Sequence, residues 1–186
     1  MKIICINGAP GCGKDTLAEH MLPQISTECE ICKFSTPLKE LAAYFFDIRI
    51  EDIESREWKN SVLCSKTGRT GRDFLIDISE KLIKPNLGND WFAEDLCDYL
   101  SADTPVVALI TDSGFQIEVD ALIKRFGAEA VGVIQIHRSG YTYDGDSREY
   151  VTAPIMEQVF NTSTLEEFFQ RSEIAVNKLL ERLTHV

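Results

Sequence analysis

The chain has 186 residues, of which 44% are hydrophobic and 26% are charged, as in a single globular domain with a buried core. Its formal net charge of −11 and pI near 4.7 argue against a protein that holds nucleic acid mainly by bulk electrostatic attraction. The apolar run from Ile3 to Ile6 is too short for a signal peptide or a membrane span, so we expect a cytoplasmic protein with no membrane partner.

The first fifty residues predict two units of strand and helix. Residues 2–7 form an apolar run that ends at a glycine, which is typical of a buried strand. Apolar residues then recur at helical spacing from Leu17 to Leu22, and Pro23 is expected to stop this helix. A second strand over 31–35 and an amphipathic helix over 38–46 follow.

The middle of the chain, residues 51–101, contains no convincing strand. It shows three helical stretches, over 53–62, 72–83 and 90–100. We interpret this region as a helical insertion in the core, and an insertion of this kind is a natural place to bind an acceptor.

Strands and helices alternate again after the insertion. The predicted strands cover 105–111, 130–136 and 158–160, and the predicted helices cover 119–126 and 165–183. A polar loop over about 138–150 is long enough to suggest a mobile lid. We therefore predict one α/β domain over 1–186, with a core of 1–50 and 102–186. Its parallel sheet should carry helices on both faces and bind ligands at the carboxyl ends of the strands.

A phosphate-binding loop follows the first predicted strand. The pattern Gly8-x-x-x-x-Gly13-Lys14 places glycine N–H groups, a helix N-terminus and a lysine around one anion. The residues that we expect to bind ATP here are Gly8, Ala9, Pro10, Gly11, Cys12, Gly13 and Lys14. Their place between a buried strand and an amphipathic helix is the context that such a loop requires, so the pattern predicts ATP as phosphate donor.

The residue after the lysine departs from the usual pattern of this loop. Asp15 stands where a serine or threonine is usual, and Thr16 follows it. A carboxylate is a good ligand for a hard cation such as Mg²⁺, so Asp15 and Thr16 are the candidate metal and ATP contacts. Alternatively, Asp15 caps the helix and Thr16 packs against it.

The loop resembles the Gly-Lys-Asp-Thr form found in phage deoxynucleoside monophosphate kinases, within the nucleoside monophosphate kinase superfamily. Further stretches are similar to family segments in order and spacing. They are Phe34-Ser-Thr-Pro-Leu-Lys39, Gly71-Arg-Asp-Phe-Leu75, Asn89-Asp-Trp-Phe92 and Asn161-Thr-Ser-Thr-Leu-Glu-Glu167. The resemblance covers nearly the whole chain, although only the phosphate loop is specific by itself.

The resemblance implies roles for particular residues. Lys14 would contact the outer phosphates of ATP, Arg138 and Arg148 would belong to the lid, and Asn161 would lie by the adenine. Asp146-Ser147-Arg148 is where a closing lid would bring a guanidinium to the transferring phosphate, so Arg148 is a catalytic candidate. The acceptor side would involve Ser35, Lys39, Arg72, Trp91, Gly114 and Phe115. For each lid arginine, simple exposure to solvent is the alternative.

One departure bears on the acceptor. The family usually has Asp-x-Arg-Phe after the central strand, whereas this chain has Asp112-Ser113-Gly114-Phe115. A monophosphate normally demands a bidentate arginine, so the missing arginine weakens the case for a free nucleotide. The chain is then similar to phage kinases that phosphorylate 5-hydroxymethyluracil within DNA, in thymidine hypermodification. Asp112 would be the base for such an alcohol, or alternatively a holder of Mg²⁺.

Three functions remain open at this point. The first is a kinase of the hydroxymethyl group of 5-hydroxymethyl-deoxyuridine in phage DNA. A basic stretch supports it, since Lys59, Lys66, Arg69 and Arg72 could hold DNA phosphates, and Trp58, Phe74, Trp91 or Phe92 could stack on an extruded base. A solvated loop and core aromatics are the alternatives. The second function is a deoxynucleoside monophosphate kinase, and the third is a nucleotide-binding switch without an acceptor.

Overall fold

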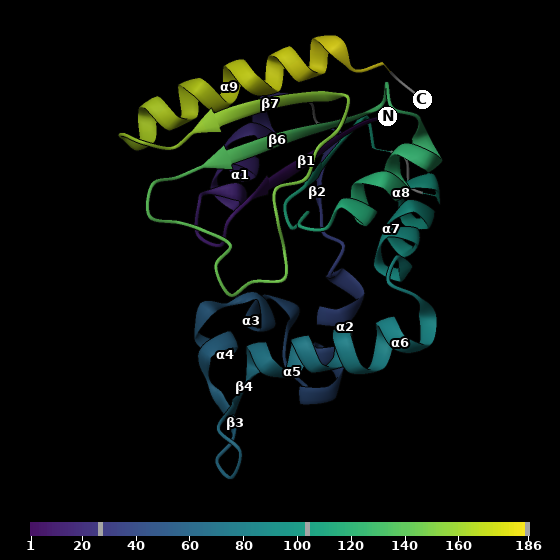
Figure 1. Cartoon of the computed structure of the whole chain (residues 1–186), viewed down its shortest axis with the longest axis vertical. Coiled ribbons are helices and arrows are strands. Elements are labelled where there is room, and N and C mark those ends of the chain that lie inside the picture. Colours follow the sequence, from purple (N-terminus) through teal and green to yellow (C-terminus); the bar gives the residue numbers. More distant parts are fainter. Residues whose placement is uncertain (26–27, 103–104, 185–186) are drawn as a thin grey trace. The chain divides into compact units, whose positions relative to one another are not determined.

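A computed structural model describes residues 1–25, 28–102 and 105–184 of the chain (Figure 1). Residues 26–27, 103–104 and 185–186, which belong to the predicted core ranges, lie outside the described residues. The chain divides into two compact units. The first consists of Met1–Phe34 and Ala93–Val186, and the second of Ser35–Phe92.

The first unit is built on a five-stranded sheet. Its strands are β1 (Lys2–Gly8), β2 (Cys29–Cys32), β5 (Val107–Ile110), β6 (Val131–His137) and β7 (Ile155–Phe160). They lie in the order β2-β5-β1-β6-β7 and every neighbouring pair is parallel. The predicted α/β architecture is therefore confirmed, and β1 at the centre delivers the glycine loop to the carboxyl edge of the sheet.

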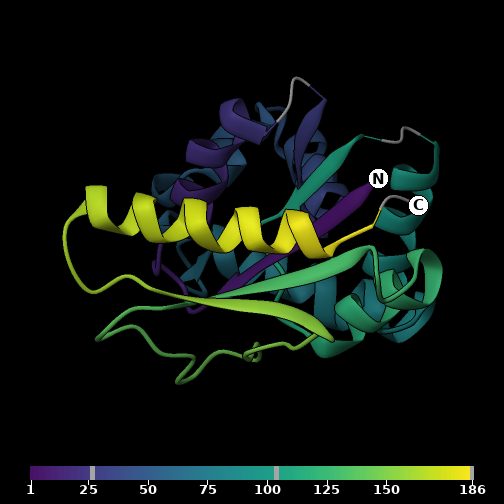
Figure 2. The same ribbon diagram turned by 90° about the horizontal axis from the view of Figure 1, so that it is seen from above.

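Helices cover both faces of this sheet. Two of them, α1 (Lys14–Ile25) and α9 (Leu165–Arg182), share a buried apolar cluster with β1 residues Ile4 and Ile6, and Figure 2 shows α9 running along β6 and β7. The opposite side carries α8 (Gln116–Phe126) and the part of α7 (Trp91–Ala102) that belongs to this unit. Side chains alternate along a strand, so Asn7 lies on the face opposite Ile4 and Ile6.

Several boundaries in the first unit differ from the predicted ones; β2, for example, covers Cys29–Cys32 rather than 31–35. The first helix does not stop at Pro23 but continues through it to Ile25. Proline removes one backbone donor and disfavours a helix interior, and only two further residues follow Pro23 before the helix ends. The last strand also starts earlier than predicted, at Ile155. Its residues are mostly half-buried at the edge of the sheet and form no clear apolar run, so the sequence did not show where it begins.

The second unit is mainly helical. Its helices are α2 (Thr36–Phe46), α3 (Ile50–Glu54), α4 (Arg56–Asn60), α5 (Gly71–Asp77), a π-helical segment (Ile78–Ile83) and α6 (Lys84–Leu87). The expectation of no strand in this region was wrong, since β3 (Val62–Cys64) and β4 (Arg69–Thr70) form an antiparallel hairpin. These strands are too short, and their side chains too exposed, to produce an alternating apolar pattern.

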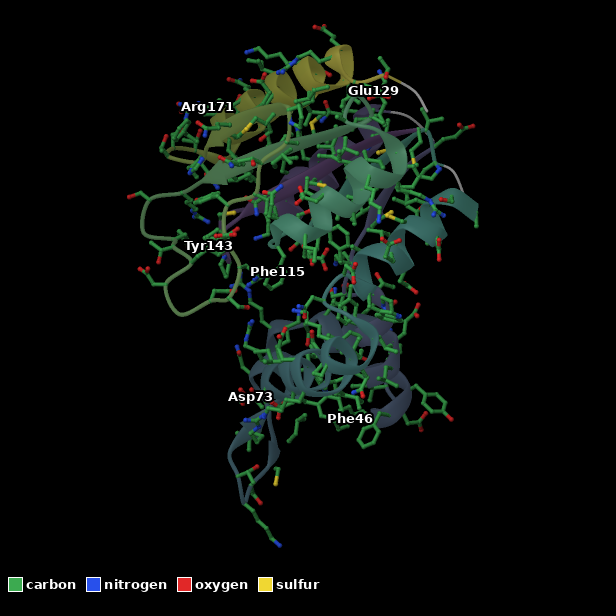
Figure 3. The ribbon with its side chains drawn as sticks, turned by 45° about the vertical axis from the view of Figure 1, so that its right-hand side comes forward. Phe46, Asp73, Phe115, Glu129, Tyr143 and Arg171 are labelled. Atoms are coloured by element: carbon green, nitrogen blue, oxygen red, sulfur yellow. The ribbon has the colours of Figure 1, made fainter. Side chains whose placement is uncertain are left out.

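Aromatic rings form the interior of this second unit. The Phe46 ring, labelled in Figure 3, meets the rings of Trp58 and Phe74 edge-on, with centroid distances of 5.5 and 4.9 Å. Thr70 caps α5 by accepting a hydrogen bond from the Asp73 N–H, and the Asp73 carboxylate accepts the Thr70 N–H in return. The unit overlaps the predicted insertion of 51–101, although it begins earlier and ends earlier.

Candidate functional site

The glycine loop leaves β1 at Gly8 and enters α1 at Lys14. Gly8, Gly11 and Gly13 have φ angles of 156°, 80° and 115°, a region that L side chains rarely adopt. Space requires glycine as well, because a Cβ atom at Gly8 would lie 2.6 Å from Cys12 Sγ and 2.7 Å from the carbonyl oxygen of Ile136. The backbone thus forms a tight cradle at the N-terminus of a helix, which suits a polyphosphate.

Lys14 lies over this loop. Its Nζ donates hydrogen bonds to the carbonyl oxygens of Gly8 at 2.6 Å and Ala9 at 3.1 Å. Burial lowers the pKa of the ammonium group, and the positive charge of Arg148 lowers it further, whereas the carboxylates of Asp15 and Asp112 raise it. Lys14, Asp112 and Arg148 therefore belong to one electrostatic group.

Asp112 follows β5 at the carboxyl edge of the sheet. One of its carboxylate oxygens accepts a hydrogen bond of 2.9 Å from the backbone N–H of Phe34. This bond fastens the chain after β2 to the end of β5. The negative charge of Asp112 also raises the pKa values of both Lys14 and Arg148.

Arg148 comes from the long loop between β6 and β7. Its guanidinium forms a bidentate pair with Asp146, with Nε to Oδ1 at 2.8 Å and Nη2 to Oδ2 at 2.5 Å. Hydrogen bonding to the Asp146 carboxylate raises the pKa of this guanidinium. The arginine is therefore held in one orientation and remains charged at any working pH.

The aliphatic stem of Arg148 lies directly on Gly114. A Cβ atom added at Gly114 would stand 2.5 Å from Cδ, 2.6 Å from Cγ and 2.9 Å from Cβ of Arg148. A backbone hydrogen bond of 2.9 Å from the Glu149 N–H to the Gly114 carbonyl oxygen joins the same two segments. The position without an arginine in the sequence is thus covered by an arginine from elsewhere in the chain.

Asn7, which the sequence analysis did not select, is fully buried beside the glycine loop. Its amide nitrogen donates to the carbonyl oxygens of Ser113 at 2.9 Å and Glu149 at 3.0 Å, and to the Tyr143 hydroxyl at 3.1 Å. Its oxygen accepts the Val151 N–H at 3.1 Å. A polar residue at the end of an apolar strand was the available signal, but its partners are more than a hundred positions away.

Two tyrosines of the long loop lie against the glycine loop. The Tyr143 hydroxyl, on the loop labelled in Figure 3, accepts hydrogen bonds from Asn7 and from the Gly8 N–H, and burial raises the pKa of Tyr143 to about 12. The Tyr141 ring lies so close to Gly11 that a Cβ there would be 2.8 Å from its Cε1 atom. The long loop and the glycine loop are therefore in direct contact.

Arg138 and Asn161, both predicted to bind ATP, contact the glycine loop through its carbonyl groups. Arg138 Nη1 donates to the Gly11 oxygen at 3.0 Å, and its guanidinium lies 4.5 Å from the centre of the Tyr141 ring. Asn161 Nδ2 donates to the Cys12 oxygen at 2.9 Å. These contacts bring both residues to the loop, while their roles toward ATP remain predictions.

A cavity of about 610 Å³ lies next to these two residues. It is mainly apolar, and its lining consists of His137, Arg138, Ser139, Tyr141, Thr142, Tyr143, Tyr150, Phe160 and Thr162. The His137 ring stacks between Tyr150 at 4.5 Å and Phe160 at 5.2 Å. Aromatic walls of this kind suit a planar ring such as a nucleobase.

The remaining acceptor candidates belong to the second unit, except Phe115, whose backbone N–H donates to Glu118. Lys39 Nζ donates to the Glu54 carboxylate at 2.9 Å, and Ser35 accepts the Lys39 N–H through its carbonyl oxygen. Arg72 is exposed, and the Trp91 ring packs edge-on against Phe92. These contacts are described within the unit, so an acceptor role for its residues stays a prediction.

The basic stretch proposed for DNA is partly neutralised by its own unit. Arg69 pairs with Asp77, and Lys59 donates to the carbonyl oxygen of Glu54 at 2.7 Å. Lys66 and Arg72 are exposed. Trp58 and Phe74 belong to the aromatic interior described above, which favours the core interpretation of these rings.

Oxygen ligands for Mg²⁺ lie at the start of α1 and the end of β5. Asp15 and Thr16 are both exposed in the first turn of the helix, and Asp112 acts electrostatically on Lys14 beside them. Among residues 1–25, 28–102 and 105–184, no group of three or more His, Cys, Asp and Glu side chains is arranged to hold a metal ion. A hard cation shared with phosphates needs only one or two carboxylates, so the residues present fit that mode of binding.

No protein-family model and no curated protein matches the chain. Among solved structures, it is similar to a protein from Janibacter sp. HTCC2649 described as a sugar kinase, with a TM-score of 0.51 and 12% identity, over 100% of this chain and 99% of that one. A gluconokinase from Sinorhizobium meliloti 1021 gives a TM-score of 0.46 and 12% identity over 97% of both chains, which is too weak to carry an argument.

The fold is therefore established as five parallel strands with helices on both faces and the glycine loop after the central strand, an architecture similar to that of the Janibacter structure. The likeness concerns the fold alone and does not extend to the phage kinase groups that the motifs resemble. In the part of the chain that the structure describes, none of the helices has the length and apolar character to cross a bilayer.

Proposed function

We propose that this chain is an ATP-dependent kinase with a deoxynucleotide-type acceptor. The observation that carries the proposal is the cradle of Gly8, Gly11 and Gly13 closed by Lys14, beside the charged group of Asp112 and Arg148. An arginine near the phosphate lysine suits a site that stabilises a transferring phosphate, so we rank the nucleotide-binding switch below the kinase.

In this proposal the chain's own groups bind and orient the phosphates. Backbone N–H groups of the loop and of the first turn of α1 hold the triphosphate, and Lys14 neutralises its outer oxygens. Asp15 and Thr16 would hold Mg²⁺, which when bound neutralises charge on the β- and γ-phosphates. The cavity beside Arg138 and Asn161 would take the base of ATP.

The transfer step has a simple balance. The bond between the γ-phosphorus and the bridging oxygen of the β-phosphate breaks, and a bond from the γ-phosphorus to an acceptor oxygen forms. Arg148 stabilises the charge that accumulates on the transferring group. A monophosphate acceptor attacks with an oxygen that is already anionic, whereas an alcohol must release a proton, for which Asp112 is the available base.

The contact between Gly114 and Arg148 bears on the choice of acceptor. The case for a hydroxymethyl group in DNA rested on the lack of an arginine at position 114, but a guanidinium stem lies on that glycine. The guanidinium itself is paired with Asp146, so a phosphate-bearing acceptor would gain a bidentate partner by displacing that carboxylate. This supports a deoxynucleoside monophosphate as acceptor, with 5-hydroxymethyl-deoxyuridine in DNA as the second candidate.

The charge distribution keeps the second candidate open. The second unit carries nine Lys and Arg against ten Asp and Glu, a formal charge of −1, whereas the whole chain carries −11. The acidic excess that opposes DNA binding therefore lies in the first unit. A sugar is a third acceptor to include, because the structurally similar Janibacter protein is described as a sugar kinase.

The test offers γ-labelled ATP with each acceptor class in parallel. The acceptors are the deoxynucleoside monophosphates, duplex DNA containing 5-hydroxymethyluracil, and a panel of hexoses and gluconate. We expect label in deoxynucleoside diphosphates. Label in DNA or in a sugar alone would contradict the preferred acceptor, and label in none of them would contradict the kinase.

Asp112→Asn separates the two nucleotide acceptors by mechanism. For a monophosphate no proton is removed, so this variant should lose less activity than one that has lost a general base, whose contribution is about 10²–10⁴-fold. A loss in that range, with a bell-shaped pH profile in the wild type, would favour the alcohol instead.

A further inference from the structure

Gly114 and Arg148 are in contact, and neither the fold nor the phosphate loop explains why position 114 is a glycine. Gly114 is buried in the loop that follows β5, and its φ is not in the left-handed region. An L side chain would therefore meet no backbone strain at this position. The requirement for glycine comes from the stem of Arg148, whose Cδ and Cγ would lie 2.5 and 2.6 Å from an added Cβ.

Hydrogen bonds hold both sides of this contact. Asn7 donates to Ser113, the residue before Gly114, and to Glu149, the residue after Arg148. The Glu149 N–H in turn donates to the Gly114 carbonyl oxygen at 2.9 Å. The backbone segments that carry the glycine and the arginine are thus tied together through a residue that directly precedes the phosphate loop.

The far end of the arginine is oriented as well. Asp146 holds the guanidinium at two points, 2.8 and 2.5 Å, and accepts the Arg148 N–H at 3.0 Å. The charges of Asp112 and Lys14 act on the same group. Stem, backbone and head of Arg148 each have a separate support.

We propose that Gly114 is a positioning residue for phosphate transfer. Its missing side chain forms a seat on which the stem of Arg148 lies, and Asn7 fixes this seat to the phosphate loop. Gly114 touches neither phosphate nor acceptor and acts only through Arg148. The proposal rests on the proposed kinase function for its effect on rate, but the seat itself is testable without any transfer activity.

The variant that tests the seat is Gly114→Ala. Its single methyl group displaces the stem of Arg148 but introduces no charge and no backbone strain. The matched control is Gly132→Ala on β6, where an added Cβ would stand 3.4 Å from Leu179 and Leu183, an ordinary contact. The control adds the same methyl group to another buried glycine of the first unit without reaching Arg148.

The first readout is limited trypsin digestion followed by mass spectrometry. Cleavage after Arg148 should accelerate by about tenfold or more in Gly114→Ala, because the seated side chain is released. Cleavage after Arg138, on the same loop, serves as the internal reference and should not change. Equal cleavage after Arg148 in Gly114→Ala and wild type would overturn the seat, whether or not the protein is a kinase.

The second readout is transfer kinetics in a double-mutant cycle. Gly114→Ala should lower kcat by about 10²-fold while the dissociation constant of ATP changes little. Arg148→Ala should lower kcat by about 10²–10³-fold. The double variant should have a kcat no lower than that of Arg148→Ala alone. Additive losses would show that Gly114 acts independently of Arg148 and would contradict the proposal.

Folding is controlled within the same cycle. If Gly114→Ala alone lowers the thermal midpoint, the double variant should restore part of it, because Arg148→Ala removes the colliding Cγ and Cδ and leaves only the Cβ at 2.9 Å. No recovery at all would count against the seat. If the wild type transfers no phosphate to any acceptor, the kinase proposal fails, and the digestion alone decides on the seat.

Discussion

At the scale of single residues, three charges act on one another at the carboxyl edge of the sheet. Asp112 raises the pKa values of Lys14 and Arg148, and Arg148 lowers that of Lys14, whose own burial lowers it most. The neighbours of Lys14 thus shift its pKa in both directions. Phosphate binding by Lys14 should be lost as the pH rises through this depressed pKa.

Two variants that should shift the Lys14 pKa in opposite directions test these interactions. Asp15→Asn removes a carboxylate that raises the pKa of Lys14 and should move its titration to lower pH, whereas Arg148→Gln should move it to higher pH. Carbon-13 NMR of the Lys14 side chain measures both shifts directly, with Lys178 on the exposed side of α9 as reference. Shifts of the same sign in both variants would contradict the assignment.

Asn7 is a fully buried polar residue whose side chain makes four hydrogen bonds. Asn7→Ala would leave the carbonyl oxygens of Ser113 and Glu149 and the N–H of Val151 without this partner. Each buried group left unsatisfied costs about 1–3 kcal/mol, so we expect a loss of about 3 kcal/mol or more in the free energy of unfolding. Urea denaturation measures it.

Tyr143→Phe is the comparison, since it removes the hydroxyl that accepts hydrogen bonds from Asn7 and from the Gly8 N–H, and leaves the other three hydrogen bonds of Asn7. We expect this variant to lower the free energy of unfolding by about 1 kcal/mol. An Asn7→Ala loss no larger than that of Tyr143→Phe would show that Asn7 does not hold the loop to the sheet.

At the scale of elements, the loop between β6 and β7 differs along its length. Residues 149–151 are fastened to the sheet through Asn7, Gly114 and Gln135, whose amide donates to the Val151 oxygen at 2.8 Å. The middle of the loop contacts the phosphate loop through side chains instead. A moving lid, predicted over 138–150, would have to exclude its last residues.

Hydrogen exchange measures this division. The N–H groups of Glu149 and Val151, which donate to Gly114 and Asn7, should exchange slowly, whereas those around Gly140 and Gly145 should exchange quickly. ATP should then slow exchange in the second group only. Fast exchange at Val151 without ATP would show that the whole loop moves.

The elements also show where prediction from the sequence worked. Strands β1, β5 and β6 and the glycine loop were found because each is a run of adjacent residues with one pattern. The β3–β4 hairpin was missed, since its strands of three and two residues carry no period. Pro23 was weighted too strongly as a stop signal, since α1 continues through it for two more residues.

The candidate site divides in the same way. Lys14 lies within six residues of the glycines that it serves, so a local motif was sufficient. The contact of Gly114 with Arg148 and the contacts of Asn7 join segments that are far apart in the chain. A single sequence carries no sign of such pairs, and the glycine was therefore interpreted as a missing arginine.

At the scale of the whole molecule, the two units differ in charge and in the features that they carry. The first unit holds the phosphate loop, the loop arginine and the aromatic cavity, and it carries nearly all of the net negative charge. The second unit is close to neutral and has its own aromatic interior. Phosphate transfer by the first unit is the central claim.

Transfer of label from γ-labelled ATP by the wild type and by Lys14→Ala tests that claim most directly. Lys178→Ala, an exposed lysine on α9 far along the chain from the loop, is the matched control. We predict transfer by the wild type and the control and loss of about 10²-fold or more in Lys14→Ala. Full activity in Lys14→Ala, or no ATP-dependent transfer by the wild type, would contradict the account.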